Sequence, residues 1–236
     1  MPSFFVLFCA NIHNPLVSED YLMVKEIKIP DVTIERVALY LRPLEDFVKS
    51  GEYVISSDKL AELCNVNPAQ VRKDLSFFGE FGVRGVGYQV GELLKEIKKI
   101  LASDREWRLG IAGLDDIGMA LVQHKNFLRR GYRFVAAFDS SPRNIGRHLP
   151  MGLVVKPLSK LKESAINLSL EIGVIATAPS EAQKTADLFF ESGILAVLNF
   201  SATHLRKPDC CLVQNVDFTF NLDHLAYRLN KKNRVK

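Results

Sequence analysis

The stretch GIAGLDDIGMAL, residues 110–121, decides the fold of the larger part of this chain. It follows a short apolar segment and opens a run with helical periodicity, which places it at a turn between a strand and a helix. Turns of this kind that hold a dinucleotide carry the pattern G-x-G-x-x-G. Read from Gly113, the chain gives G-L-D-D-I-G, so Asp115 stands where the middle glycine belongs. The stretch therefore indicates a nucleotide site, an altered nucleotide site, or only the fold that such sites use.

Apolar segments alternate with helix-like segments from Trp107 to the end of the chain. This alternation predicts an α/β fold with a Rossmann-like, doubly wound parallel sheet, which we assign to residues 105–218. We expect strands at 108–113, 133–139, 153–158, 172–178, 195–200 and 211–217, and helices at 119–131, 159–168, 180–192 and from 219 onward. Ligands of such sheets bind beyond the carboxyl ends of the strands, where the quoted turn also lies.

A carboxylate completes the predicted nucleotide site. Asp139 ends the strand that follows the turn, about 20 positions on, where an acidic residue binds a ribose hydroxyl in dinucleotide-binding folds. The site is predicted to consist of Gly113, Leu114, Asp115, Asp116, Ile117, Gly118 and Asp139.

The side chain of Asp115 leaves the binding of NAD(H) open. The middle glycine lets backbone approach the pyrophosphate, and Asp115 places a β-carbon and a negative charge there. Two like charges about 4 Å apart cost about 1 kcal/mol in water and about 4 kcal/mol at an effective dielectric of 20, so affinity falls by about one to three decades. Alternatively, the carboxylate caps the following helix and occupies the donors that a phosphate would use.

The N-terminal part of the chain has a different pattern. Apolar residues at helical spacing predict an amphipathic helix over 33–50 with Thr33 as its N-cap. A short strand at 53–57 follows, and we expect Ser57 to cap a second helix at 58–66 that buries Leu60, Ala61 and Leu63.

The segment NVNPAQVRKDLSFFGEFG, residues 65–82, predicts a third helix. Asn67 is a good N-cap, Pro68 suits the first helical position, and Gln70 stands where a reciprocal capping-box residue belongs. The helix is expected to bury Val71, Leu75 and Phe78. Two helices joined by a tight turn, the second opening with donors and cations, are typical of a helix-turn-helix.

A glycine-rich hairpin follows this pair of helices. Gly82, Gly85 and Gly87 alternate with larger residues around Arg84, as in the wing of a winged helix-turn-helix domain, where an arginine reaches the minor groove. We assign residues 29–104 to this domain, including a closing helix at 91–103. Its predicted DNA contacts are Gln70, Arg72, Lys73, Ser76, Arg84 and Tyr88. The alternative is a helix pair whose cations are only solvated.

Composition sets broad limits. The chain has 236 residues and a formal charge of +4, which permits nucleic-acid binding without requiring it. Its four cysteines form no C-x-x-C pair, which favours a reducing cytoplasm and no metal site. The sequence predicts no membrane span. Residues 1–28 are expected to be a tail, disordered or arising from a start-site assignment, since Met23 is an alternative start to Met1.

Enzyme motifs are absent from the sequence. The histidines at 124, 148, 204 and 224 are far apart, and no pattern ties any of them to a nucleophile. We predict no catalytic residues, with an NAD-dependent dehydrogenase as the rival hypothesis.

Both halves together resemble one family, the Rex redox-sensing transcriptional repressors of bacteria, from about residue 29 to about residue 231. The segments LYLRPLE, VRKDLSFFGEFGVRGVGY, GMAL, AAFD, AQKTADLFFESGI, LNF and NVDF carry the resemblance. It implies a homodimer on an inverted-repeat DNA operator, with NAD(H) in each Rossmann domain and release of DNA when NADH binds. It also implies DNA contacts by Arg72 and Lys73 from the recognition helix and by Arg84 from the wing.

The resemblance further implies how the two parts are coupled. Arg42 and Asp217 match a pair that the family uses between subunits, and the helix at 219–236 would be exchanged across the dimer. Departures from the family pattern gather around the nucleotide site, at Asp115, Ser141, His124, and residues 178–183 and 199–203. The expected function is thus a cytoplasmic repressor that responds to the NADH/NAD+ ratio. A family member with weakened or lost NAD(H) binding is the alternative.

Overall fold

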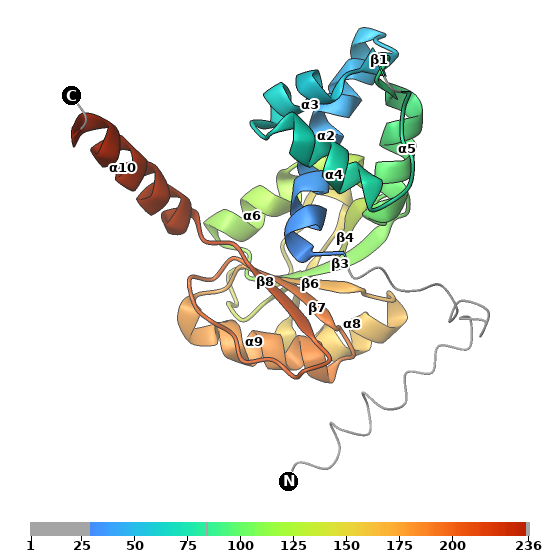
Figure 1. Ribbon diagram of the computed structural model, residues 1–236. Helices are drawn as coiled ribbons and strands as arrows, with labels where there is room; N and C mark the ends of the chain where they lie inside the picture. The colour runs from blue at the N-terminus through green and yellow to red at the C-terminus, as the bar shows by residue number, and fades with distance from the viewer. Residues whose placement is uncertain (1–28, 84, 235–236) are drawn as a thin grey trace. The chain divides into compact units, whose positions relative to one another are not determined.

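The computed structural model describes residues 29–83 and 85–234, and the chain divides into two compact units between Arg105 and Glu106 (Figure 1). The expectations for the tail at 1–28 and for Arg84 lie outside the described residues. Each unit is built around its own apolar core.

The N-terminal unit is a small helical domain with a two-stranded sheet. Its elements are α2 (Asp31–Ser50), β1 (Val54–Ile55), α3 (Ser57–Cys64), α4 (Pro68–Ser76), β2 (Tyr88–Gln89) and α5 (Val90–Ile100). The two strands pair antiparallel, with Ile55 opposite Tyr88. The core contains fully buried residues from α2, α3, α4 and α5, among them Tyr40, Leu60, Leu75 and Ile97. The predicted winged helix-turn-helix architecture is confirmed.

Two helix starts in this unit differ from the prediction. Helix α2 begins two residues before Thr33, after Pro30, whose side chain makes no cap hydrogen bond. Thr33 is instead buried, and its Oγ1 accepts a hydrogen bond of 3.3 Å from Arg36 Nη2. Helix α3 is capped by Ser56, whose Oγ accepts from the backbone N–H of Lys59 at 3.0 Å. Ser56 and Ser57 have the same capping side chain, and the prediction of Ser57 as the N-cap is wrong.

Two predicted core positions are also corrected. Leu63 is 46% exposed rather than buried. Helix α4 ends at Ser76, so Phe78 packs against the core from the segment after the helix.

The C-terminal unit holds a six-stranded parallel sheet. Its strands are β3 (Trp107–Ala112), β4 (Tyr132–Asp139), β5 (Val155–Pro157), β6 (Ile172–Ile175), β7 (Ala196–Asn199) and β8 (Leu212–Asn215). Their order is β5-β4-β3-β6-β7-β8, with every neighbouring pair parallel. The chain runs outward from β3 to β5 and then returns to β6, so the order reverses between β3 and β6. The predicted doubly wound sheet is confirmed.

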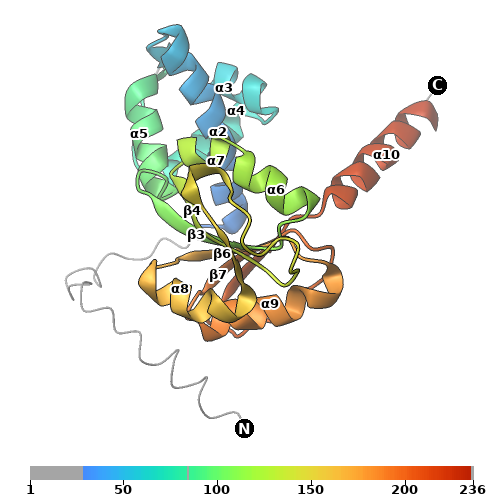
Figure 2. The same ribbon diagram turned by 180° about the vertical axis from the view of Figure 1, so that it is seen from behind.

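Helices cover both faces of this sheet (Figure 2). Helices α6 (Asp116–Gln123) and α7 (Asn126–Arg129) lie on one face, and α8 (Leu161–Asn167) and α9 (Pro179–Glu191) lie on the other. Short 3₁₀ turns at Pro150–Gly152 and Leu158–Lys160 flank β5, so the strand expected at 153–158 is only three residues long.

The single helix predicted at 119–131 is two helices. The backbone of His124 is extended, with ψ of 108°, which ends α6 before α7 begins. His124 Nδ1 accepts a 3.3 Å hydrogen bond from the backbone N–H of Asn126, so the imidazole satisfies a donor at the start of α7. The apolar period continues across the break, which explains why the sequence pattern did not reveal it.

The last helix, α10 (Phe218–Arg234), projects from the sheet (Figure 1). Its side chains are exposed from Phe218 to Asn233, including those of Phe220, Leu222, Leu225 and Leu229, which are 59–70% exposed. Asp217 caps its start, since Oδ1 accepts from the backbone N–H of Thr219 at 2.8 Å. No described residue of the same unit covers these apolar side chains, and exposed apolar surface of this extent is typical of an interaction site.

Candidate functional site

Helix α4 has an exposed polar face and a buried face. Asn67 caps the helix as predicted, with Oδ1 accepting from the backbone N–H of Ala69 at 2.8 Å, and Pro68 occupies the first turn. Arg72, Lys73 and Ser76 are exposed, while Val71 and Leu75 are buried. The cations therefore lie on one open face of a short, capped helix, which is the arrangement that a groove-reading helix needs.

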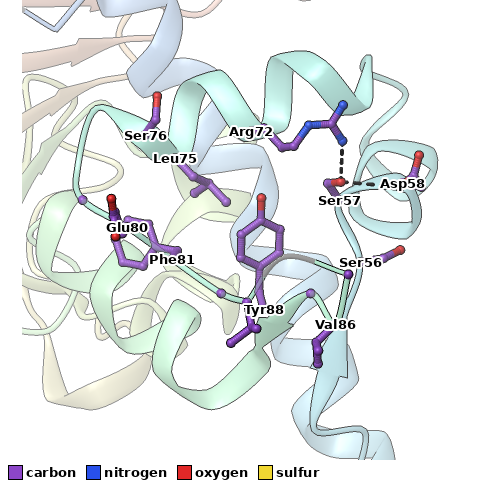
Figure 3. Close-up of a pocket in the computed structure, with 15 residues that line it drawn as sticks. Ser56, Ser57, Asp58, Arg72, Leu75, Ser76, Glu80, Phe81, Val86 and Tyr88 are labelled. Atoms are coloured by element: carbon purple, nitrogen blue, oxygen red, sulfur yellow. Dashed lines mark hydrogen bonds between the residues drawn. The ribbon is translucent and has the colours of Figure 1, made fainter.

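A groove of about 710 Å³ runs beside this helix, between the start of α3, helix α4 and the glycine-rich hairpin (Figure 3). Tyr88 is 8% exposed and stands in the middle of the groove. Burial raises the pKa of its phenol, and the positive charge of Arg72 partly opposes that rise. A hydrogen bond of 2.9 Å from the backbone N–H of Val83 to the carbonyl oxygen of Gly87 closes the glycine-rich hairpin.

Arg72 is held in place by Ser57, which was predicted to be the N-cap of α3. Its Nη1 donates to Ser57 Oγ at 2.7 Å, as the dashed line in Figure 3 shows. Because Ser56 caps α3, the hydroxyl of Ser57 is available for this contact. Ser57 thus restricts the guanidinium to the mouth of the groove.

An ion pair with a buried carboxylate joins α4 to α2. Asp74 is fully buried, and its two carboxylate oxygens each accept a 2.7 Å hydrogen bond from the Arg36 guanidinium. Tyr40 donates a further hydrogen bond of 2.8 Å, and Gln70 one of 2.7 Å. Burial acts to raise the pKa of Asp74, but the hydrogen bonds from Arg36, Gln70 and Tyr40 outweigh it, so the pKa is lowered.

This network changes the interpretation of Gln70. The side chain was predicted to complete a capping box and to contact DNA, but its amide donates to Asp74 on the same helix. Among the described residues, the backbone N–H of Asn67 makes no hydrogen bond to the Gln70 amide oxygen, so the predicted capping box does not form.

The nucleotide turn lies where the strand order reverses. Gly113 follows β3 and has φ of +91°, a conformation that favours glycine. A β-carbon there would lie 2.5 Å from the backbone of Ala176 and Thr177, at the end of β6. A β-carbon on Gly118 would collide with the carbonyl of Gly113. The first and third glycines thus give the tight turn and the close helix–strand contact of a dinucleotide-binding fold.

The Asp115 carboxylate does not cap α6. Asp115 holds the N-cap position of that helix but makes no side-chain cap hydrogen bond, so the capping alternative is wrong. Its Oδ1 accepts instead from Asn144 Nδ2 at 3.3 Å. Asp115, Asp116 and Ile117 are exposed at the start of α6, and Leu114 is buried.

Asp139 lies at the carboxyl end of β4, next to this turn. It is 5% exposed, and its Oδ2 accepts from the backbone N–H of Leu114 at 2.8 Å and from Asn144 Nδ2 at 3.0 Å. Oδ1 accepts from the backbone N–H of Ser141 at 2.7 Å. A carboxylate accepts about four hydrogen bonds, two at each oxygen. Because Oδ2 of Asp139 already accepts two and Oδ1 accepts one, a ribose hydroxyl would bind at Oδ1.

A buried hydroxyl at the same edge has no partner. Thr177 follows β6 and is 9% exposed, and its Oγ1 makes no hydrogen bond to any described residue. Burying such a hydroxyl unpaired costs about 1–3 kcal/mol, which a hydrogen-bonding ligand would recover. Together with the Gly113 turn, this hydroxyl fits a ribose or pyrophosphate at the junction of β3 and β6.

The two residues predicted to couple subunits lie in different units. Arg42 is exposed on α2, and Asp217 is exposed before α10. Hydrogen bonds from the hydroxyl and backbone N–H of Thr219 lower the pKa of Asp217, so its carboxylate is ionised at neutral pH. An exposed guanidinium and an exposed carboxylate are available for a contact between copies of the chain.

Sequence reasoning missed three residues of these sites: Ser57, Asn144 and Thr177. Thr177 lies near the carboxyl end of the strand predicted at 172–178, and that position was its only signal. Ser57 and Asn144 gave none, because their roles depend on partners 15 and 29 residues away along the chain. Within residues 29–83 and 85–234, no helix is long and apolar enough to cross a membrane.

Comparisons with known proteins cover almost all of the described chain. The family model described as a putative DNA-binding protein N-terminus matches residues 28–76, and the CoA binding domain model matches residues 104–203. The redox-sensing transcriptional repressor Rex of Syntrophobacter fumaroxidans is 48% identical over 87% of this chain and 98% of its own length. The chain belongs to the Rex family. The Rex repressor of Maridesulfovibrio salexigens is 43% identical over 87% of this chain and 98% of its own length.

Solved Rex-family structures have the same fold. The repressor RSP with β-NAD+ and operator DNA matches 88% of this chain and 95% of its own, with a TM-score of 0.81 and 31% identity. RSP with β-NADH matches 88% of this chain and 97% of its own, with a TM-score of 0.80 and 30% identity. The resemblance inferred from the sequence is confirmed. The names of these relatives describe a transcriptional repressor, so they support the repressor hypothesis rather than the rival hypothesis of a dehydrogenase.

Proposed function

We propose that this chain is a DNA-binding transcriptional repressor that releases its operator when NADH binds. The observation that carries the proposal is the pairing of two sites in one Rex-family chain. One is the open cationic face of α4 beside a groove. The other is the Gly113 turn with the unpartnered Thr177 hydroxyl at the strand-order reversal.

In the DNA-binding half, α4 would enter the major groove. Arg72 would read a guanine edge or bind phosphate, and Lys73 and Ser76 would bind the backbone. Arg84, in the wing, would enter the minor groove, and Tyr88 would support the wing from the groove floor. Gln70 acts through Asp74, which fixes α4 against α2.

In the nucleotide-binding half, the N–H groups at the start of α6 would face the pyrophosphate. Thr177 would donate to or accept from the nucleotide, and Asp139 would bind an adenosine ribose hydroxyl. When bound, NAD(H) supplies a signal rather than a reaction, and no catalytic residue is proposed.

Assembly would connect these halves. We propose a homodimer that binds an inverted-repeat operator, with α10 exchanged between copies so that its exposed apolar side chains are covered. Arg42 of one copy would pair with Asp217 of the other, and the protein would work in the cytoplasm. The domains would be those assigned from the sequence: 29–104 for DNA, 105–218 for NAD(H) and 219–236 for exchange.

A redox-insensitive regulator is the second candidate. Two exposed carboxylates, Asp115 and Asp116, stand at the start of α6, where a pyrophosphate would bring further negative charge. The two candidates differ in one measurable property, which is the affinity for NADH.

Selection from a random duplex library identifies the operator, and calorimetric titration with NADH and NAD+ then measures nucleotide binding. Operator binding that is lost with NADH supports the proposal. Specific operator binding without any NADH affinity supports the redox-insensitive candidate. Oxidation of NADH with small carbonyl substrates, without a specific operator shift, would instead favour a dehydrogenase.

Ser57→Ala is expected to weaken operator binding by about 0.5–1.5 kcal/mol, the net value of one hydrogen bond, because it frees Arg72. Arg72→Ala is expected to cost about 1–3 kcal/mol and to relax specificity at one base pair. Both are measured by fluorescence anisotropy at fixed salt. Ser50→Ala is the control, since the Ser50 hydroxyl donates to the Phe47 carbonyl outside the groove. Equal affinities for Ser57→Ala and wild type would refute the positioning role.

Thr177→Val is expected to change stability and nucleotide affinity in opposite directions. Removing an unpartnered buried hydroxyl should stabilise the free protein by about 1 kcal/mol, whereas loss of the ligand contact should weaken NADH binding by a similar amount. Thermal unfolding without nucleotide and calorimetry with NADH measure the two effects. Weakened folding with unchanged affinity would show that Thr177 is not a nucleotide contact.

A further inference from the structure

An asparagine from the loop after β4 joins two carboxylates of the nucleotide site. Asn144 is 6% exposed, and its Nδ2 lies 3.0 Å from Asp139 Oδ2 and 3.3 Å from Asp115 Oδ1. A side-chain amide nitrogen carries two N–H groups, so it can donate one hydrogen bond to each carboxylate. Asn144 therefore bridges the residue that replaces the middle glycine and the residue that ends β4.

An arginine fixes the orientation of this amide. Arg147 Nη1 donates to Asn144 Oδ1 at 2.9 Å. A guanidinium only donates hydrogen bonds, so the amide oxygen must face Arg147 and the amide nitrogen must face the carboxylates. The Asn144 amide thus connects the Arg147 guanidinium to the Asp115 carboxylate.

These contacts fix the orientation of the Asp115 carboxylate. The carboxylate accepts from Asn144 in the loop after β4, and it makes no cap hydrogen bond to α6. The N-terminal donors of α6 are therefore not taken by Asp115. A carboxylate without such a partner would turn toward those donors, because they attract negative charge.

We propose that Asn144 is a positioning residue that holds the Asp115 carboxylate away from the start of α6, so that the pyrophosphate of NAD(H) can bind there. The inference rests on the proposed function. It explains how a chain with aspartate at the middle glycine position keeps its nucleotide site. Asn144 and Arg147 would then compensate for the substitution rather than contact the nucleotide.

A double-mutant cycle tests the proposal. NADH affinity is measured by calorimetry for the wild type, Asn144→Ala, Asp115→Gly and the double variant. Asn144→Ala is expected to weaken NADH binding about tenfold in the wild-type background, as the loss of one charge-assisted hydrogen bond implies. In the Asp115→Gly background, the same change should alter affinity by less than about twofold, because no carboxylate remains to turn.

Two arginines of the same loop give a matched control. Arg147→Ala should weaken NADH binding like Asn144→Ala, and the effect should again vanish with Asp115→Gly. Arg143→Ala should leave the affinity nearly unchanged, because the Arg143 guanidinium has no hydrogen-bond or ion-pair partner among the described residues. Thermal unfolding of each variant measures any loss of stability independently.

Equal factors for Asn144→Ala in both backgrounds would overturn the inference, since Asn144 would then act through Asp139 or through folding. An unchanged affinity in the wild-type background would overturn it as well. Failure of all four proteins to bind NADH would refute the NADH-responsive function itself. The failures of the two proposals are thus distinguishable.

Discussion

Replacing Arg36 with alanine is expected to destabilise the N-terminal unit by about 3–5 kcal/mol, because a buried carboxylate then loses its countercharge. Asp74 is fully buried, and the Arg36 guanidinium supplies hydrogen bonds of 2.7 Å to both of its oxygens. Urea unfolding, with amide exchange in α4 to identify the unit, measures the loss. Operator affinity should fall with it, since Asp74 joins the recognition helix to α2.

An exposed ion pair provides the control for this prediction. Lys59 and Glu62 form a 3.0 Å ion pair whose side chains are 48% and 68% exposed. Lys59→Ala should cost no more than about 1 kcal/mol, the usual range for surface pairs. Similar losses for Lys59→Ala and Arg36→Ala would contradict the account of the buried pair.

The same ion pair predicts a pH dependence. The pKa of Asp74 is lowered in the folded protein, so the carboxylate binds protons less readily than in the unfolded chain, where the pKa is about 3.9. Its contribution to stability is therefore complete above about pH 4 and is lost as the pH falls through the lower folded pKa. The stability difference between wild type and Asp74→Asn should accordingly shrink below about pH 4.

Gly113→Ala is expected to abolish nucleotide binding and to destabilise the C-terminal unit by about 2–5 kcal/mol. The residue has φ of +91°, and a β-carbon would lie 2.5 Å from backbone atoms of Ala176 and Thr177. Backbone atoms at the end of β6 cannot move aside without disturbing the sheet. The turn would open, and the start of α6 would shift away from the strand ends.

Gly146→Ala separates backbone strain from this close approach. Gly146 has φ of +85°, but a β-carbon there would meet no atom within 4 Å. This variant should cost only about 1 kcal/mol of strain and leave NADH affinity nearly unchanged. Comparable losses for both glycines would show that conformational strain alone, rather than packing of β3 against β6, explains the role of Gly113.

Local sequence signals predicted most of the fold. Asn67 and Pro68 begin the recognition helix where their capping preferences place it. The alternation of apolar strands and helices gave the parallel sheet, because each segment's period reports its own secondary structure. The prediction failed where two local solutions are nearly equal in energy, as for the neighbouring serines at the start of α3, and where a helix breaks within a continuous apolar period at His124.

The electrostatics of the nucleotide site were less predictable. The sequence identified Asp115 as a substitution of the middle glycine, but the direction of its side chain depends on Asn144, 29 residues further along the chain. The unpartnered hydroxyl of Thr177 is likewise a property of the folded sheet. Such features arise when strand ends meet, and no periodicity or spacing rule encodes them.

The most direct test of the central claim is titration of NADH into the wild-type protein bound to its selected operator, followed by fluorescence anisotropy and parallel calorimetry. The account predicts that anisotropy falls as NADH is added, over the same concentration range in which calorimetry detects binding. Stable operator binding at saturating NADH, or the absence of any heat of NADH binding, would contradict it.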